Sequence, residues 1–159
     1  MRKLRITIVT YDWPPRNSIG THRPYSWARY WCENGQDVTV LTAKKKNFDS
    51  PLDLELPKLN GVKVIEVPYQ LFLGPILKFP FIEKIGKWLR KKFMNYLGPN
   101  LDPRKAWFLA TSPIFSKLAR ESDVVISTHG PDVAHIIGCK MKILCPSIYW
   151  IADYRDLWS

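Results

Sequence analysis

Five short stretches, apolar and rich in β-branched residues, predict the strands of one sheet. The first, "KLRITIVTY", carries a continuous β-branched and apolar run, which is typical of a parallel strand buried on both faces. In the last stretch, Pro146 marks either a kink or a late start of the strand. The predicted strands cover residues 3–11, 37–43, 62–68, 122–130 and part of 142–156.

Between these stretches the apolar residues recur with the spacing of an α-helix. The clearest helix is predicted over residues 21–34, with Thr21 as its N-cap and Asn34-Gly35 as its end. Its apolar face is spaced at i, i+3, i+4 and i+7 and consists of Pro24, Trp27, Ala28 and Trp31. Further helices are predicted over residues 82–97, over 104–110 or 113–120, and from Pro131 to Gly138.

This alternation of strands and helices predicts an α/β fold with a doubly wound, mainly parallel, Rossmann-like sheet. Residues 1–159 are expected to form one domain, since their number suffices to bury a core. The sequence has no run of eighteen apolar residues, which is about the length that a membrane-spanning helix needs.

The net charge limits the kinds of binding partner that the protein is expected to have, and the cysteine content indicates its cellular compartment. The chain has 24 lysines and arginines against 14 acidic residues, a net charge of +10, which favours nucleic acid, phosphate-bearing small molecules or an anionic membrane surface. Three cysteines without CxxC spacing indicate reduced thiols in a cytoplasmic protein and no metal site. The Lys44–Lys46 run is interpreted as a solvated strand exit.

The loop between the first strand and the first helix is a candidate site. Ligands of parallel sheets bind at the carboxyl ends of the strands, and a helix N-terminus favours phosphate or carboxylate. Gly20 would let the backbone approach a ligand closely, and Arg16, His22 and Arg23 add donors. The loop lacks two glycines of GxGxxG, which disfavours a dehydrogenase-type nucleotide site. A purely structural strand-to-helix turn is the alternative.

Three sequence motifs, which follow one another along the chain in the order given below, resemble those of glycosyltransferase family four. The members of this family have the GT-B fold. "VTYDWPPRNSIGTHRPYSWARYWCENGQDVTVLTA" resembles the N-terminal signature of the family, and "SDVVISTHGP" resembles its fourth strand and the following turn. "YWIADYRDLWS" resembles the "DFRDPW" stretch of a bacterial branch associated with cell-surface polysaccharides. The resemblance covers both ends of the chain and hardly touches residues 47–120.

This resemblance implies a retaining glycosyltransferase that needs no metal or other cofactor. Its substrates would be a nucleotide-sugar donor and a glycan or lipid-linked acceptor. GT-B enzymes have two Rossmann-like domains, and the C-terminal one binds the nucleotide-sugar and carries a Glu-x7-Glu pattern. Because no such pattern occurs here, we expect residues 1–159 to be the N-terminal, acceptor-side half, with the C-terminal donor-binding domain absent. This half alone is expected to transfer no sugar.

The resemblance also implies a set of site residues. The expected catalytic residues are His129 and Asp153, each at the end of a predicted strand. The expected substrate-binding residues are Trp13, Arg16, Ser18, Ile19, Gly20, Arg23, Arg155 and Asp156. Two departures weaken the transfer of roles. The glycine turn reads "SIGTH" instead of having two adjacent glycines, and Asp153 stands roughly where many members have a histidine that hydrogen-bonds the donor sugar.

Each of these residues also has a structural interpretation. His129 could be structural or solvated, and His135 is expected to be structural inside a short apolar helix. Asp153, Arg155 and Asp156 could form an ion-pair network that satisfies itself. All of these structural interpretations are compatible with the predicted α/β fold.

The basic amphipathic helix predicted over residues 82–97 indicates peripheral contact with the inner face of the cytoplasmic membrane. The alternative is a helix packed on the sheet with a solvated basic face. A second class of function is a non-catalytic phosphate- or nucleic-acid-binding module, motivated by the net charge. The sequence lacks an aromatic and basic sheet face, a helix-turn-helix and zinc-ligand spacing, so no nucleic-acid partner is expected.

Overall fold

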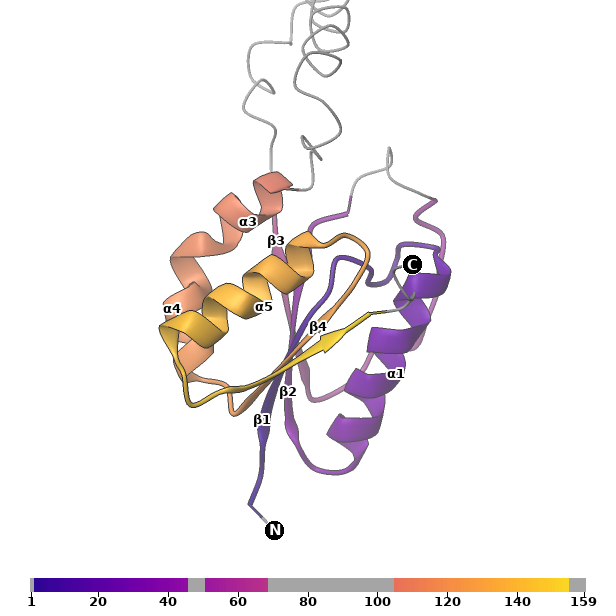
Figure 1. Ribbon diagram of the computed structural model, residues 1–159. Coiled ribbons are helices and arrows are strands. Elements are labelled where there is room, and N and C mark those ends of the chain that lie inside the picture. The colour runs from indigo at the N-terminus through magenta and orange to yellow at the C-terminus, as the bar shows by residue number, and fades with distance from the viewer. Residues whose placement is uncertain (1, 46–50, 69–104, 155–159) are drawn as a thin grey trace, which may run out of the picture.

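A parallel sheet forms the centre of the chain in the computed structural model, which describes residues 2–45, 51–68 and 105–154 (Figure 1). Its five strands are β1 Arg5–Val9, β2 Asp37–Ala43, β3 Val62–Val67, β4 Val124–Thr128 and β5 Tyr149–Asp153. They pair in the order β3-β2-β1-β4-β5, and each pair is parallel. This is the order of a Rossmann-like sheet, whose winding reverses between β1 and β4. The predicted fold class is confirmed.

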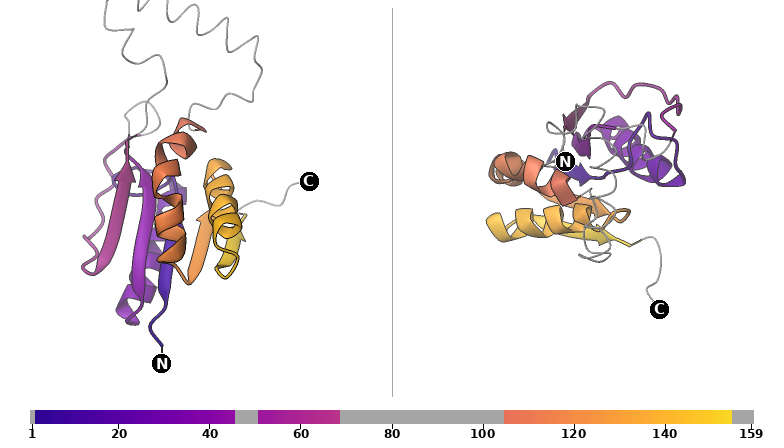
Figure 2. Two further views of the ribbon diagram at one scale, coloured as in Figure 1. Left: turned by 90° about the vertical axis from the view of Figure 1, so that its left-hand side faces the viewer. Right: turned by 90° about the horizontal axis from the view of Figure 1, so that it is seen from above.

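Helices cover both faces of the sheet (Figures 1 and 2). Helix α1 (Ile19–Glu33) lies on one face, where Tyr25 and Ala28 pack with Ile8 and Val40. The opposite face is covered by α3 (Lys105–Thr111), the 3-10 turn η2 (Ser112–Ile114), α4 (Phe115–Arg120) and α5 (Val133–Leu144). Both alternatives for the helix before β4 are therefore present, as α3 and α4 joined by η2.

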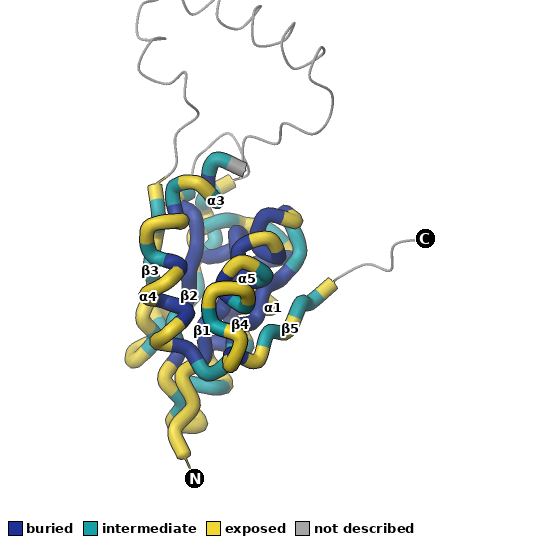
Figure 3. The backbone as a smooth tube through the Cα atoms, turned by 60° about the vertical axis from the view of Figure 1, so that its left-hand side comes forward, coloured by how far each residue is buried: buried dark blue, intermediate teal, exposed yellow. Residues whose placement is uncertain are grey.

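Burial follows the position of each strand in the sheet (Figure 3). Strand β1 is largely buried, as its continuous apolar run predicted, and its neighbour β2 is largely buried as well. The outer strand β5 exposes Tyr149 and Ile151, because α1 covers the sheet mainly over β1 and β2. Among the described residues no helix combines the length and the apolar character required to cross a membrane.

Helix α1 begins earlier than predicted. Its N-cap is Ser18, whose backbone is extended at φ −147°, and Thr21 lies buried inside the helix. The Thr21 hydroxyl donates to the carbonyl of Arg16 at 2.8 Å, so it holds the preceding loop instead of capping the helix. The end of the helix is as predicted, since Asn34 is the C-cap and Gly35 has φ +77°, which glycine adopts without strain.

Helix α5 continues past Gly138, where the sequence predicted its end. A Cβ atom at this position would lie 2.5 Å from Nε1 of Trp150 on β5 and 3.1 Å from Oγ of Ser127 on β4. Gly138 therefore allows close contact between helix and sheet. Strand β5 starts at Tyr149, which confirms the late start after Pro146. The helix predicted over residues 82–97 lies outside the described residues.

Candidate functional site

The loop after β1 is held by contacts within itself. Asp12 and Arg16 form an ion pair with Oδ1 and Nε 2.8 Å apart, and their side chains are 7% and 13% exposed. The Arg16 guanidinium also lies over the ring of Tyr11, 5.3 Å from its centroid. Arg16 was predicted to bind substrate, but in this structure its charge is balanced and mostly buried.

Lys45 supports the same loop from the end of β2. Its ammonium donates to the Tyr11 carbonyl at 2.6 Å, to the Ala43 carbonyl at 2.7 Å and to the Thr42 hydroxyl at 2.7 Å. Burial lowers the pKa of Lys45 to about 7, despite the opposing effect of nearby carboxylates. The prediction of a solvated lysine was wrong here, because this side chain folds back to bond the strand ends.

Three predicted site residues gather at the carboxyl ends of β4 and β5. Arg23 of α1 lies against Asp153, with Nη1 3.2 Å from Oδ1 and 3.3 Å from Oδ2. The backbone N–H of His129 donates to the Asp153 carbonyl at 3.0 Å. Residues from three separate motifs therefore meet at the carboxyl edge of the sheet, one strand away from the β1–β4 pair where the winding reverses and where ligands bind in open α/β sheets.

A histidine and tyrosine cluster lies next to this contact. The rings of His129 and His135 are 5.8 Å apart and stacked, and the Tyr154 ring lies 4.5 Å from that of His135. His135 Nδ1 is 2.8 Å from Ser127 Oγ, to which Trp150 Nε1 donates at 2.9 Å. Sequence reasoning missed this cluster, and the only signal for it was that His129 and His135 both lie near the end of one predicted strand.

Burial also changes the acidity of His135. Burial and the nearby His129 lower the pKa of the imidazole, while the carboxylates of Asp153 and Asp132 raise it less. The ring is therefore neutral at neutral pH, and its Nε2 has no hydrogen-bond partner among the described residues. His135 has a structural role through its contact with Ser127, as predicted. Its Nε2 atom is the polar atom for which this structural role gives no partner.

The remaining predicted residues lie elsewhere or have another role. Trp13 is 6% exposed and packs on Tyr25 with the ring centroids 5.9 Å apart, which argues against stacking on a ligand. Ser18, Ile19 and Gly20 open α1; Ile19 is almost fully exposed and Gly20 is buried. Arg155 and Asp156 lie outside the described residues. Within the described ranges no cluster of His, Cys, Asp or Glu could hold a metal ion.

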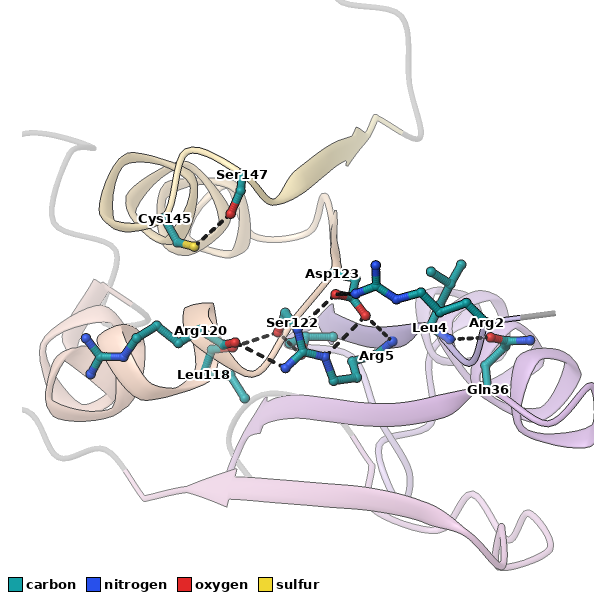
Figure 4. Close-up of polar contacts among 11 residues, drawn as sticks. Arg2, Leu4, Arg5, Gln36, Leu118, Arg120, Ser122, Asp123, Cys145 and Ser147 are labelled. Carbon is teal, nitrogen blue, oxygen red and sulfur yellow. Dashed lines mark hydrogen bonds and ion pairs between the residues drawn. The ribbon is translucent and has the colours of Figure 1, made fainter.

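A cavity of about 530 Å³ lies at the opposite, amino-terminal end of the sheet, beside the polar contacts that Figure 4 shows around Arg5 and Asp123. Its lining includes Arg2, Arg5, Arg120 and Asp123. Arg5 donates to Asp123 from its backbone N–H at 2.9 Å and from its guanidinium Nη2 at 2.8 Å. The Arg5–Asp123 contact therefore joins the start of β1 to the start of β4. Ligands of open α/β sheets bind at the other end, so we assign this region a structural role.

Replacing Asp123 by asparagine is expected to flatten the acid dependence of stability. Hydrogen bonds from the side chain and backbone of Arg5 lower the pKa of Asp123 from 3.8 to about 2. The unfolded chain therefore binds more protons between these values, so this contribution to stability is complete above about pH 4 and is lost as the pH falls toward 2. Thermal unfolding should show a steeper fall in Tm over this window for the wild type than for D123N. Parallel curves would contradict the assignment.

Comparison with known proteins yields no family assignment. No protein-family model matches the chain, and no curated protein matches its sequence. The resemblance to glycosyltransferase family four therefore rests on the three motifs alone.

Proposed function

We propose that this domain is the N-terminal, acceptor-side half of a retaining glycosyltransferase with the GT-B fold. The enzyme would transfer a sugar from a nucleotide-sugar to a glycan or lipid-linked acceptor, in the synthesis of a bacterial polysaccharide. The observation that supports this most is the meeting of Arg23, His129 and Asp153 at the carboxyl ends of β4 and β5. These residues come from the three motifs that carry the family resemblance.

The three side chains suit a sugar and a departing diphosphate. The Arg23 side chain is about half exposed, at 49%, so its guanidinium can donate to a phosphate oxygen while it remains beside Asp153. The Asp153 carboxylate accepts hydrogen bonds from sugar hydroxyls, and His129 lies within the same group of residues. In this class of reaction the protein contributes mainly positioning and stabilisation of the developing charge on the leaving group.

The proposal requires a second domain to complete the site. The residues described here form one wall, and the nucleotide-sugar would be held mainly by the other. A lipid-linked acceptor would be reached at the inner face of the cytoplasmic membrane, where the basic segment 82–97 is predicted to make contact.

Arg23→Ala is expected to lower kcat/KM for sugar transfer by about 100-fold, the effect of removing one donor that stabilises transition-state charge. Asp153→Asn should lower it as well, because the paired carboxylate both orients Arg23 and meets the sugar. Transfer is measured as nucleotide release from a panel of nucleotide-sugars, with polyprenyl-phosphate-linked glycans as acceptors. The enzyme assayed, called the extended chain below, is residues 1–159 joined to the donor-binding GT-B domain that the proposal requires.

Arg29→Ala is the matched control, because Arg29 lies on the same helix, is exposed and pairs only with Glu33 at 2.9 Å among the interactions given by the structure. It should leave kcat/KM unchanged. Equal activity of Arg23→Ala and the wild type would show that the contact between Arg23 and Asp153 does not have the assigned role. Transfer by residues 1–159 alone at the rate of the extended chain would contradict the two-domain proposal. Nucleotide binding without any transfer would favour a non-catalytic phosphate-binding module.

A further inference from the structure

The polar atoms around Ser127 form a short buried chain of hydrogen bonds. Trp150 Nε1 can only donate, so Ser127 Oγ accepts from it at 2.9 Å. Ser127 is fully buried, and its Oγ also lies 2.8 Å from Nδ1 of His135. In this second contact, between Ser127 Oγ and His135 Nδ1, one atom donates a proton and the other accepts it. The donor is either the serine hydroxyl or the protonated Nδ1 of the ring.

One of these two arrangements leaves fewer polar atoms without a hydrogen-bond partner than the other. If Ser127 donates to Nδ1, the hydroxyl both donates and accepts, and only the N–H at Nε2 of His135 is left over. If Nδ1–H donates to Ser127 instead, the hydroxyl proton and the Nε2 lone pair both lack a described partner. Buried polar groups in folded proteins are rarely left unpaired, so the first arrangement is favoured. Trp150 and Ser127 thus fix the tautomer with the proton on Nε2.

The surroundings of His135 indicate which oxygen this N–H would meet. His135 is 93% buried, since 7% of its surface is exposed, and its ring packs on those of His129 and Tyr154 at the carboxyl end of β4. Two carboxylates, Asp132 and Asp153, act on it electrostatically, and Arg23 balances one of them. Among the described charged groups that act on His135, one carboxylate is left unbalanced, so a neutral N–H donor here suits an uncharged oxygen better than a phosphate.

We infer that the Nε2–H of His135, held in this tautomer by Ser127 and Trp150, donates a hydrogen bond to a hydroxyl oxygen of a bound sugar. This deepens the proposed function and rests on it for the identity of the ligand. Nε2 is shielded from solvent in the structure. Tyr154, which is 56% exposed, packs its ring on the imidazole, and we place the sugar beside this exposed side chain.

The tautomer can be measured on the 159-residue chain itself, without any activity. Nitrogen NMR of the protein labelled with ¹⁵N-histidine distinguishes a protonated from an unprotonated ring nitrogen. At neutral pH we expect His135 to carry its proton on Nε2, and Ser127→Ala to abolish that preference because Nδ1 loses its donor. A proton on Nδ1, or on both nitrogens, in the wild type would overturn the inference.

The ligand is tested by adding methyl glucoside, methyl galactoside, methyl mannoside and inorganic pyrophosphate, each separately and at millimolar concentration. At least one glycoside should shift the Nε2 resonance of His135, and the shift should be lost in Ser127→Ala. Absence of a shift with every glycoside, or a shift with pyrophosphate alone, would overturn the assignment of a sugar hydroxyl. A glycoside-dependent shift without sugar transfer by the extended chain would retain this inference and reject the proposed function.

Discussion

Gly138→Ala is expected to lower the free energy of unfolding by about 2–3 kcal/mol, the usual effect of adding a methyl group to a packed contact. Helix propensity alone predicts the opposite, since alanine is favoured over glycine inside a helix by about 1 kcal/mol. The added Cβ would lie 2.5 Å from Nε1 of Trp150, and that indole is fixed by its hydrogen bond to Ser127. Helix α5 must therefore move away from the sheet or break that bond.

A double-mutant cycle tests the cause of this effect. In a Trp150→Leu background the obstructing indole is absent, so Gly138→Ala should be neutral or slightly stabilising in urea unfolding. Lys140→Ala, at an exposed position of the same helix, is the control and should stay within about 0.5 kcal/mol of the wild type. Equal losses from Gly138→Ala in both backgrounds would show that the contact with Trp150 is not the reason for the glycine.

Trp107→Ala is expected to have the largest effect of a single truncation, about 3–5 kcal/mol. Trp107 is fully buried and attaches α3 to the sheet, with its ring edge-on to Tyr11 and the centroids 5.8 Å apart. Since Tyr11 begins the loop that carries Asp12 and Arg16, loss of this packing should also loosen the candidate site.

Trp107→Phe should cost clearly less than Trp107→Ala. It keeps an aromatic ring against Tyr11 and removes an indole N–H that has no hydrogen-bond partner among the described residues. Leu109→Ala is the matched control on α3, because that side chain is 54% exposed and its truncation should cost less than about 1 kcal/mol. Urea unfolding of the three variants checks the order. If Trp107→Ala were as mild as Leu109→Ala, the attachment of α3 would have another source.

The fold was predictable because its signals are local. Continuous β-branched runs identified the central strands, and helical spacing identified α1 and its end at Gly35. The errors occurred where a contact without a sequence pattern decides. Ser18 and Thr21 are both good capping residues, and the Thr21 hydroxyl instead bonds the Arg16 carbonyl of the preceding loop. Gly138 resembles a helix stop until Trp150 is known to lie against it.

The candidate site was predictable only in part, for the same physical reason. The sequence identified Arg23 and Asp153 separately, but their contact joins residues 130 positions apart and leaves no local pattern. Lys45 was misread because a lysine run at a strand exit gives no indication that one side chain folds back to bond the strand ends. Trp13 was placed in the loop correctly, yet its burial depends on Tyr25 of the following helix.

The strand order also has a consequence for how the chain folds. Strand β1 is synthesised first and lies at the centre of the sheet, yet its neighbour β4 begins more than a hundred residues later, as the separation of 118 between Arg5 and Asp123 indicates. Contacts of such sequence separation carry a large loop-closure entropy and slow the folding rate. On the ribosome, β1 and β2 can pair early while one edge of β1 waits for a partner. Arg23 meets Asp153 only after β5 has emerged, so this contact of the candidate site forms later than the pairing of β1 with β2.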